Sequence, residues 1–115
     1  MYYETFDFDS AKRYKLNRYG EAYTIVLQET KYRDGKYAVA MHSWNEEFKF
    51  YEPWDTLTTN LLDSREEGLY AYVQTDKYLN FVLENSIGIP TGRIAKSGFN
   101  SYTEIKFTIN GREEV

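Results

Sequence analysis

The chain has 115 residues, 42% of them apolar, which fits one globular domain covering residues 1–115 and argues against a disordered polypeptide. It contains no cysteine, which excludes a disulfide scaffold, a thiol nucleophile and a cysteine-based zinc site. The net charge of −4 argues against a general nucleic-acid binder, because such proteins carry a basic stripe.

The start of the chain is acidic and aromatic, with neither the basic residues nor the apolar run of a signal peptide. No apolar stretch approaches the ~20 residues that a membrane span needs, so we expect a cytoplasmic protein without membrane contact. Tyr2–Phe8 alternates in polarity and predicts a strand, whereas the basic, polar stretch Asp9–Gly20 predicts a loop or a short helical turn.

The next segments predict a hairpin. Ala22–Glu29 and Tyr37–Trp44 are rich in β-forming residues and predict strands, and the Asp-Gly pair that begins at Asp34 predicts the turn between them. Phe48–Tyr51 predicts a third strand, which Pro53 ends or marks as an edge because proline lacks an amide donor.

The second half of the chain predicts two more β segments before a helix. Thr56–Leu62 is rich in threonine and predicts β structure, Asp63–Gly68 predicts a charged loop, and Leu69–Gln74 predicts a strand. Apolar residues at helical spacing then predict a helix near residues 76–87, which Thr75 or the next residue can cap.

The C-terminal part predicts a loop and a last strand. Gly88 suits the left-handed position just past a helix end, and Thr91–Asn100 contains several glycine and serine breaks that predict a long loop. Tyr102–Ile109 alternates and predicts a half-buried strand with one polar face. The predicted fold is therefore α+β: an antiparallel sheet of about five strands with one helix packed on one face.

Recognisable catalytic chemistry is lacking. His42 is the only histidine, and on a strand its side chain points away from that of the neighbouring Ser43. Carboxylate pairs such as Glu52 and Asp55 have no specific spacing, and surface acids are common. We expect a protein that is not an enzyme and that binds no metal and no cofactor.

Two segments are candidates for contact with a partner. The stretch from Trp44 to Glu67 combines aromatic residues with seven acids, against only two basic residues. Acids with interleaved rings suit a basic protein partner, because charge guides the encounter and rings supply contact area. The alternative is that the acids solubilise the hairpin ends while both tryptophans lie in the core. The candidate contact residues of this segment are Glu46, Glu47, Tyr51, Glu52, Trp54, Asp55, Asp63, Glu66 and Glu67.

The second candidate is the glycine-containing loop, because long loops often carry function. Its sequence forms neither a Walker loop nor a dinucleotide fingerprint, and a turn that returns the chain to the sheet is the alternative interpretation. Its candidate residues are Thr91, Gly92, Arg93, Ser97, Gly98 and Phe99.

Several of these segments together carry a resemblance. They are Tyr23–Gln28, Leu57–Leu61, Ala71–Thr75, Phe81–Asn85, Pro90–Arg93 and Ser97–Phe99. With them the chain resembles a domain family of unknown function found in small proteins encoded on bacterial phages, plasmids and conjugative elements. The resemblance implies no catalytic residues. It implies a mobile element in a host bacterial cell, where small acidic proteins without enzyme motifs are often inhibitors of host defence, such as anti-CRISPR proteins.

Two functions therefore remain open. The first is a non-catalytic inhibitor that docks on a basic surface of a nucleic-acid-handling effector, for example a CRISPR or other defence nuclease, without touching nucleic acid itself. The second is a structural or housekeeping accessory protein of the mobile element that acts through self-association as a homo-oligomer.

Overall fold

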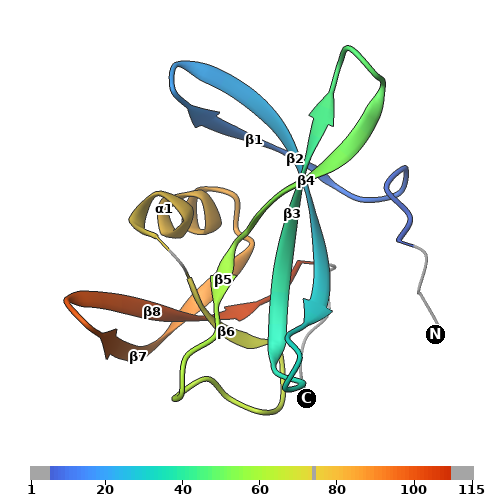
Figure 1. Ribbon diagram of the computed structural model, residues 1–115. Helices are drawn as coiled ribbons and strands as arrows, with labels where there is room; N and C mark the ends of the chain where they lie inside the picture. The colour runs from blue at the N-terminus through green and yellow to red at the C-terminus, as the bar shows by residue number, and fades with distance from the viewer. Residues whose placement is uncertain (1–5, 74, 110–115) are drawn as a thin grey trace.

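The computed structural model describes residues 6–73 and 75–109, and these form two four-stranded antiparallel sheets and one helix (Figure 1). The first sheet has the strand order β1-β2-β3-β4, and the second has the order β5-β6-β8-β7. The elements are β1 (Arg13–Arg18), β2 (Glu21–Lys31), β3 (Tyr37–Asn45), β4 (Phe50–Thr56), β5 (Thr58–Thr59), β6 (Tyr70–Val73), α1 (Asp76–Glu84), β7 (Gly88–Ser97) and β8 (Asn100–Phe107).

The first sheet is a meander in which each strand pairs with the next along the chain. The predicted hairpin between β2 and β3 is confirmed: Lys36 N donates to the Asp34 carboxylate, and the Gly35 amide donates to the Tyr32 carbonyl. Pro53 lies within β4 rather than at its end, and β4 is an edge strand of this sheet, as the missing amide donor of proline requires.

The second sheet contains the predicted helix as the connection between β6 and β7. Thr75 caps α1, since its hydroxyl accepts a hydrogen bond from the Tyr78 amide. The helix ends at Glu84, and Ser86 takes the left-handed conformation that was predicted for Gly88. Gly88 instead begins β7, where a Cβ would lie 2.5 Å from the Ile105 side chain, so only glycine fits this approach to β8.

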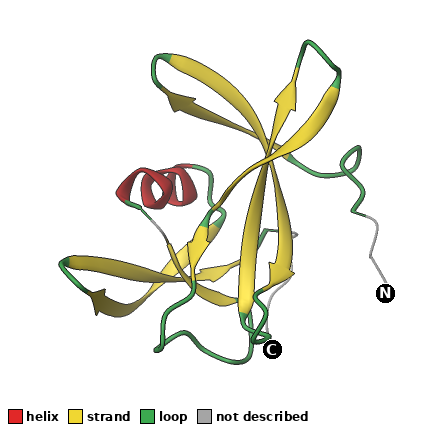
Figure 2. Cartoon of the chain, viewed as in Figure 1, coloured by secondary structure: helices red, strands yellow, loops and turns green. Residues whose placement is uncertain are grey.

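The core lies between the inner faces of the two sheets and the apolar side of α1 (Figure 2). Ile25, Leu27 and Val39 come from the first sheet, and Ile105 and Phe107 come from the second. All five side chains are buried. The helix also packs against the first sheet, where the Tyr14 ring of β1 lies 5.9 Å from the Phe81 ring.

The expectation of one sheet of about five strands was wrong, because the structure has two sheets of four. The α+β class and the antiparallel pairing are confirmed. Two missed strands account for much of the difference. Part of the expected loop Asp9–Gly20 is β1, and most of the expected loop Thr91–Asn100 is β7, which forms a tight hairpin with β8.

Two further β expectations need correction. The β structure expected over Thr56–Leu62 shrinks to the two residues of β5. The strand expected over Tyr2–Phe8 begins outside the described residues, and its described end is not a strand. There the Asp7 carboxylate accepts hydrogen bonds from the amides of Asp9 and Ser10, which holds a turn. Within residues 6–73 and 75–109, no helix is long and apolar enough to cross a membrane.

Candidate functional site

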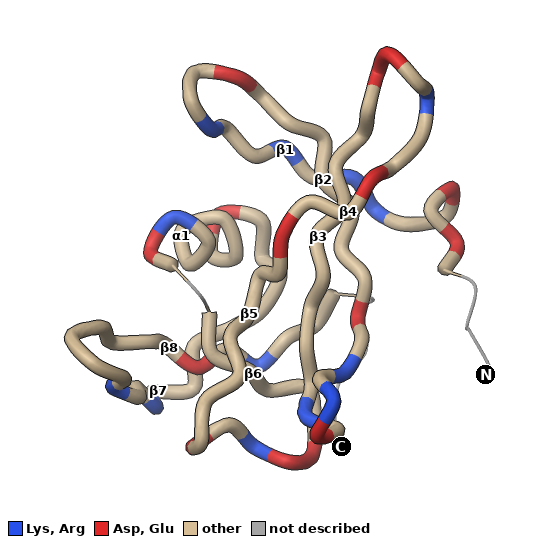
Figure 3. Tube along the Cα trace, in the orientation of Figure 1, with Lys and Arg blue, Asp and Glu red and all other residues tan. Residues whose placement is uncertain are grey.

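The acidic segment predicted as one contact surface is divided between distant parts of the fold. Glu46 and Glu47 lie in the exposed turn of the β3–β4 hairpin, whereas Asp63, Glu66 and Glu67 lie in the loop after β5. The tube in Figure 3 shows these two acidic stretches at opposite ends of the molecule. A single partner surface of ordinary size therefore meets one stretch or the other.

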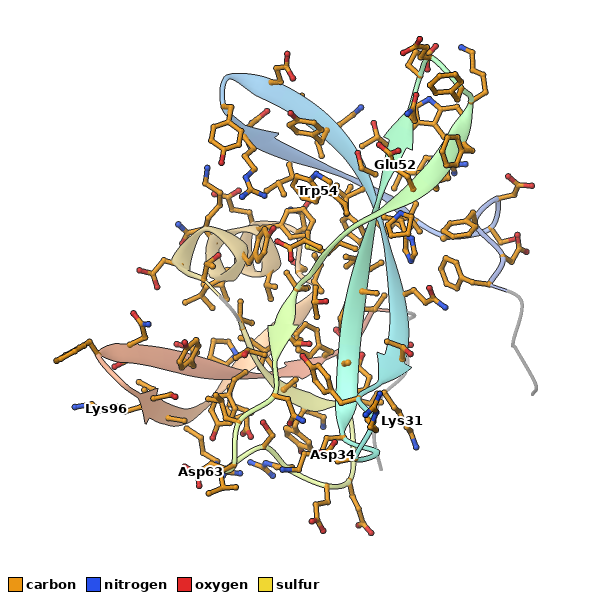
Figure 4. All side chains as sticks on the ribbon, in the orientation of Figure 1. Lys31, Asp34, Glu52, Trp54, Asp63 and Lys96 are labelled. Atoms are coloured by element: carbon orange, nitrogen blue, oxygen red, sulfur yellow. The ribbon has the colours of Figure 1, made fainter. Side chains whose placement is uncertain are left out.

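Trp54 and Asp55 lie in a third place, on the inner side of β4 next to α1 (Figure 4). The Trp54 ring stacks on Tyr23 at 5.4 Å, and the Arg18 guanidinium lies 5.2 Å from its centroid. The Asp55 carboxylate accepts a hydrogen bond of 2.5 Å from the Tyr78 hydroxyl. Burial, helped by this bond, raises the pKa of Tyr78 to about 12. These residues join the first sheet to the helix.

The buried carboxylate of Glu104 holds the loop after β5 against the second sheet. Glu104 of β8 is 0% exposed, although the alternation of its strand predicted a polar, solvent-facing side. Arg65 donates two hydrogen bonds to this carboxylate, at 2.9 and 3.1 Å, and Arg93 donates one at 3.3 Å. The Thr91 hydroxyl donates a fourth, at 2.6 Å. The loop thus covers the outer face of the second sheet.

The predicted glycine loop is therefore divided as well. Thr91 and Arg93 belong to a bulge in β7 that binds Glu104, and Gly92 lies between them with a φ of 94°. The hairpin turn between β7 and β8 contains the other candidates, Gly98 and a fully exposed Phe99, and Ser97 ends β7 beside it. The bulge stabilises the fold through its hydrogen bonds to Glu104, whereas the turn is exposed to solvent.

Aromatic side chains gather on the outer face of the first sheet. Trp44 of β3 and Tyr51 of β4 are directly opposite each other, with ring centroids 5.0 Å apart. The Phe8 ring lies parallel to Tyr51 at 5.5 Å and meets the His42 ring edge-on at 4.9 Å. The short segment before β1 thus lies against this face of the sheet.

The packing of the segment before β1 on this face explains why Val26 is buried. Val26 points to the outer face of the sheet, opposite to its neighbours Ile25 and Leu27 in the core, and yet it is 0% exposed. Val26 pairs with His42 on β3, and the Phe8 ring packs against the His42 ring. The packed segment therefore extends the apolar interior to the second side of the sheet.

An open hollow of about 540 Å³ lies between this segment and the β3–β4 hairpin. At the hairpin tip, Phe48 is 67% exposed and Phe50 is 46% exposed, which is unusual for rings of this size. The hollow is lined by Phe6, Asp7, Phe8, Asp9, Trp44, Lys49, Phe50 and Tyr51. We call these residues, together with Glu46, Glu47 and Phe48, the hairpin face.

Charge on the hairpin face is mainly negative. Hydrogen bonds from Ser10 hold the pKa of Asp7 below its usual range. The Lys49 ammonium, with help from the Trp44 indole N–H, does the same for Glu46. Of the predicted contact residues, Glu52 neighbours Tyr51 on the strand and therefore points to the opposite side of the sheet, where Asn45 donates to it at 3.4 Å.

Sequence reasoning identified Glu46, Glu47 and Tyr51 on the hairpin face and missed most of its rings. Phe8 was assigned to a strand, and Trp44 was considered for the core. Alternation along β3 was the available signal, because it places His42 and Trp44 on one face while Met41 enters the core.

His42 has no catalytic partner among the described residues. Its Nε2 lies 2.9 Å from the Gln28 side-chain oxygen, and its buried Nδ1 has no hydrogen-bond partner within residues 6–73 and 75–109. Burial lowers the pKa of this imidazole. No group of three or more histidine, aspartate or glutamate side chains in the described part of the chain is placed to hold a metal ion.

The fold and the hairpin face define a small two-sheet α+β domain with an aromatic, acidic surface. The chain belongs to the family described as domain of unknown function (DUF4313), which matches residues 24–115. This agrees with the resemblance to a family of unknown function. No curated protein and no solved structure matches the chain.

Proposed function

We propose that this protein is a non-catalytic binding protein that docks its hairpin face on a basic surface of another protein. The observation that carries the proposal is the gathering of exposed rings and acids around the tip of the β3–β4 hairpin. Among the described residues, four acids, Asp7, Asp9, Glu46 and Glu47, outnumber the nearby cations Arg13 and Lys49.

Each part of the hairpin face has a separate physical role in this proposal. Rings such as Phe48 and Phe50 lose little conformational entropy on binding and bury much area, as interface anchors do. The acids raise the encounter rate with a basic partner, and this effect weakens with salt.

The partner we propose is a nucleic-acid-handling effector of a host defence system, for example a CRISPR nuclease, which the protein inhibits from a mobile element. Such effectors present basic grooves, and a short acidic chain without an enzyme motif suits their inhibition. The net charge of −4 favours docking through a local face over mimicry of a whole nucleic acid.

The position of the two acidic stretches provides a matched experiment. Glu46→Lys with Glu47→Lys reverses two charges on the hairpin face, and Glu66→Lys with Glu67→Lys reverses two at the opposite end. Both variants have the same net charge. In an interference assay with a panel of defence nucleases, the first variant should lose inhibition and the second should keep it. Equal inhibition by both variants would contradict the proposal.

The alternative function, self-association as an accessory of the mobile element, is favoured by a different observation. β7 is an edge strand of the second sheet, Ile94 is 64% exposed on it, and the turn of the same hairpin contains the fully exposed Phe99. Light scattering after size-exclusion chromatography separates the two proposals. A stable homo-oligomer that Ile94→Lys dissociates would support self-association, and a monomer would remove its support.

A further inference from the structure

We propose that the hollow of the hairpin face is a pocket for an arginine side chain of the partner. This inference rests on the proposed function and deepens it, because it names the group that the hollow recognises. The rings and carboxylates that line one open hollow of about 540 Å³ together match a guanidinium, which is planar, cationic and a multiple hydrogen-bond donor.

The rings form two walls of different orientation. Phe8 and Tyr51 are parallel to within 7°, and Trp44 is inclined by 60° to Tyr51. Phe50 of the same hairpin also lines the hollow and is 46% exposed. Aromatic faces carry negative charge density and attract a cation within about 6 Å of the ring centre. A side chain entering this corner therefore meets more than one ring.

Carboxylates complete the lining. Asp7 and Asp9 line the hollow from the N-terminal segment, and both are exposed. Lys49 also lines it, but its ammonium is paired with Glu46. An entering guanidinium can stack on a ring and donate to a carboxylate at its edge at the same time, which an ammonium does less well.

The chain already binds its own guanidinium groups on ring faces. Arg18 lies 5.2 Å from the centroid of the Trp54 ring, and Arg65 lies 4.0 Å from that of Tyr70. On Tyr51 itself, the Arg13 guanidinium lies 5.8 Å from the ring centroid, and its Nε donates to the hydroxyl at 2.8 Å. Arg13 does not line the hollow. The lining of the hollow thus offers rings of the same kind for an arginine from outside.

The test is a titration of the whole protein with N-acetyl-arginine methylamide, followed by amide and indole NMR signals. The matched probe is the citrulline analogue, which has nearly the same shape and no charge. We expect saturable shifts of the Trp44 indole and of the amides near Asp9 and Phe50. The Trp54 indole, half-buried on the inner side of β4, should not shift. The citrulline probe should bind at least about tenfold more weakly, since a cation–π contact and a charged hydrogen bond are lost.

Variants give the inference a second test. Asp9→Asn with Phe50→Leu should weaken binding of the arginine probe at least about fivefold, whereas Glu66→Gln at the opposite end should leave it unchanged. Both variants change exposed side chains, and their NMR spectra report directly whether they fold. Absence of saturable shifts, or equal binding of arginine and citrulline probes, would overturn the inference.

The outcomes also separate this inference from the proposed function. If the arginine probe fails to bind while reversal of Glu46 and Glu47 abolishes inhibition, the arginine pocket is wrong and the docking face stands. If the probe binds as expected while that reversal leaves inhibition unchanged, the pocket is supported and the proposed function is wrong.

Discussion

Replacement of Glu104 by glutamine tests how strongly the loop after β5 is fastened to the second sheet. The native carboxylate accepts four hydrogen bonds, two from Arg65 and one each from Arg93 and Thr91. Glutamine has nearly the same shape, but it keeps one accepting oxygen and places an amide donor against guanidinium donors. The variant therefore leaves two cations facing each other without the charge that holds them.

The expected loss follows from the burial of this group. Removing one partner of a buried ion pair typically destabilises a protein by about 3–5 kcal/mol, and both guanidinium groups here are partly exposed. We therefore expect the unfolding free energy of Glu104→Gln to fall by about 3 kcal/mol. For a domain of this size, that loss lowers Tm by roughly 12 °C.

Thermal and urea unfolding followed by circular dichroism measure this effect. Glu66→Gln is the matched control, because it makes the same chemical change at an exposed position of the same loop. The control should stay within about 0.5 kcal/mol of the native protein. A Tm of Glu104→Gln within about 3 °C of the native value would refute the argument that this carboxylate holds the loop.

Three further changes probe the remaining contacts. Tyr78→Phe removes the hydroxyl that donates to Asp55 and accepts from Arg18. This change should lower the unfolding free energy measured in urea by about 1 kcal/mol. The pKa of Tyr78 is raised from 10.0 to about 12, so its stabilisation is complete below pH 10 and is lost as pH rises through about 12. The Tm of Tyr78→Phe should therefore fall less than that of the native protein over this range. The pKa of His42 is lowered from 6.5, so its contribution is complete above pH 6.5 and is lost as pH falls through the lowered pKa. Below pH 6.5, the unfolding free energy measured in urea should fall with falling pH in the native protein. It should fall less in His42→Gln. Thr75→Ala removes the N-cap of α1 and should lower the unfolding free energy by about 1 kcal/mol.

Elements with local signals could be predicted from the sequence. The β2–β3 turn depends on the side chain of Asp34 and on the glycine after it, and both interactions lie within a few residues. The start of α1 depends on Thr75 and the amide of Tyr78. Such signals need no knowledge of the rest of the fold, and the structure confirms these two.

The missed strands have nonlocal causes. In β1, Tyr14 and Leu16 alternate with charged and polar side chains, and only the packing of these two residues into the core distinguishes the strand from a basic loop. In β7, the bulge and its glycine conceal the period of two that indicates a strand. Gly88 was placed at a helix end because its close approach to β8 involves residues far along the chain.

The candidate site was only partly predictable, because the sequence shows its acids but not the contacts that form on folding. Composition identified the acids, but β4 carries the chain from the hairpin tip to the second sheet and so separates Glu46 from Glu66. Glu104 was expected on a solvent-facing side because alternation cannot show that a distant loop covers that side. The rings of Phe8 and Trp44 both pack against Tyr51, and Phe8 reaches it only through folding of the N-terminal segment onto the sheet.

The association rate with the defence nuclease that we propose as the partner is the most direct measure of docking through the hairpin face. Biolayer interferometry over a series of salt concentrations should give a rate that falls with salt for the native protein. Reversal of Glu46 and Glu47 to lysine should slow association at least about tenfold at low salt and flatten the salt dependence. Reversal of Glu66 and Glu67 to lysine should change the association rate and its salt dependence less. If both variants associate with the native rate and the native salt dependence, the hairpin face is not the docking surface.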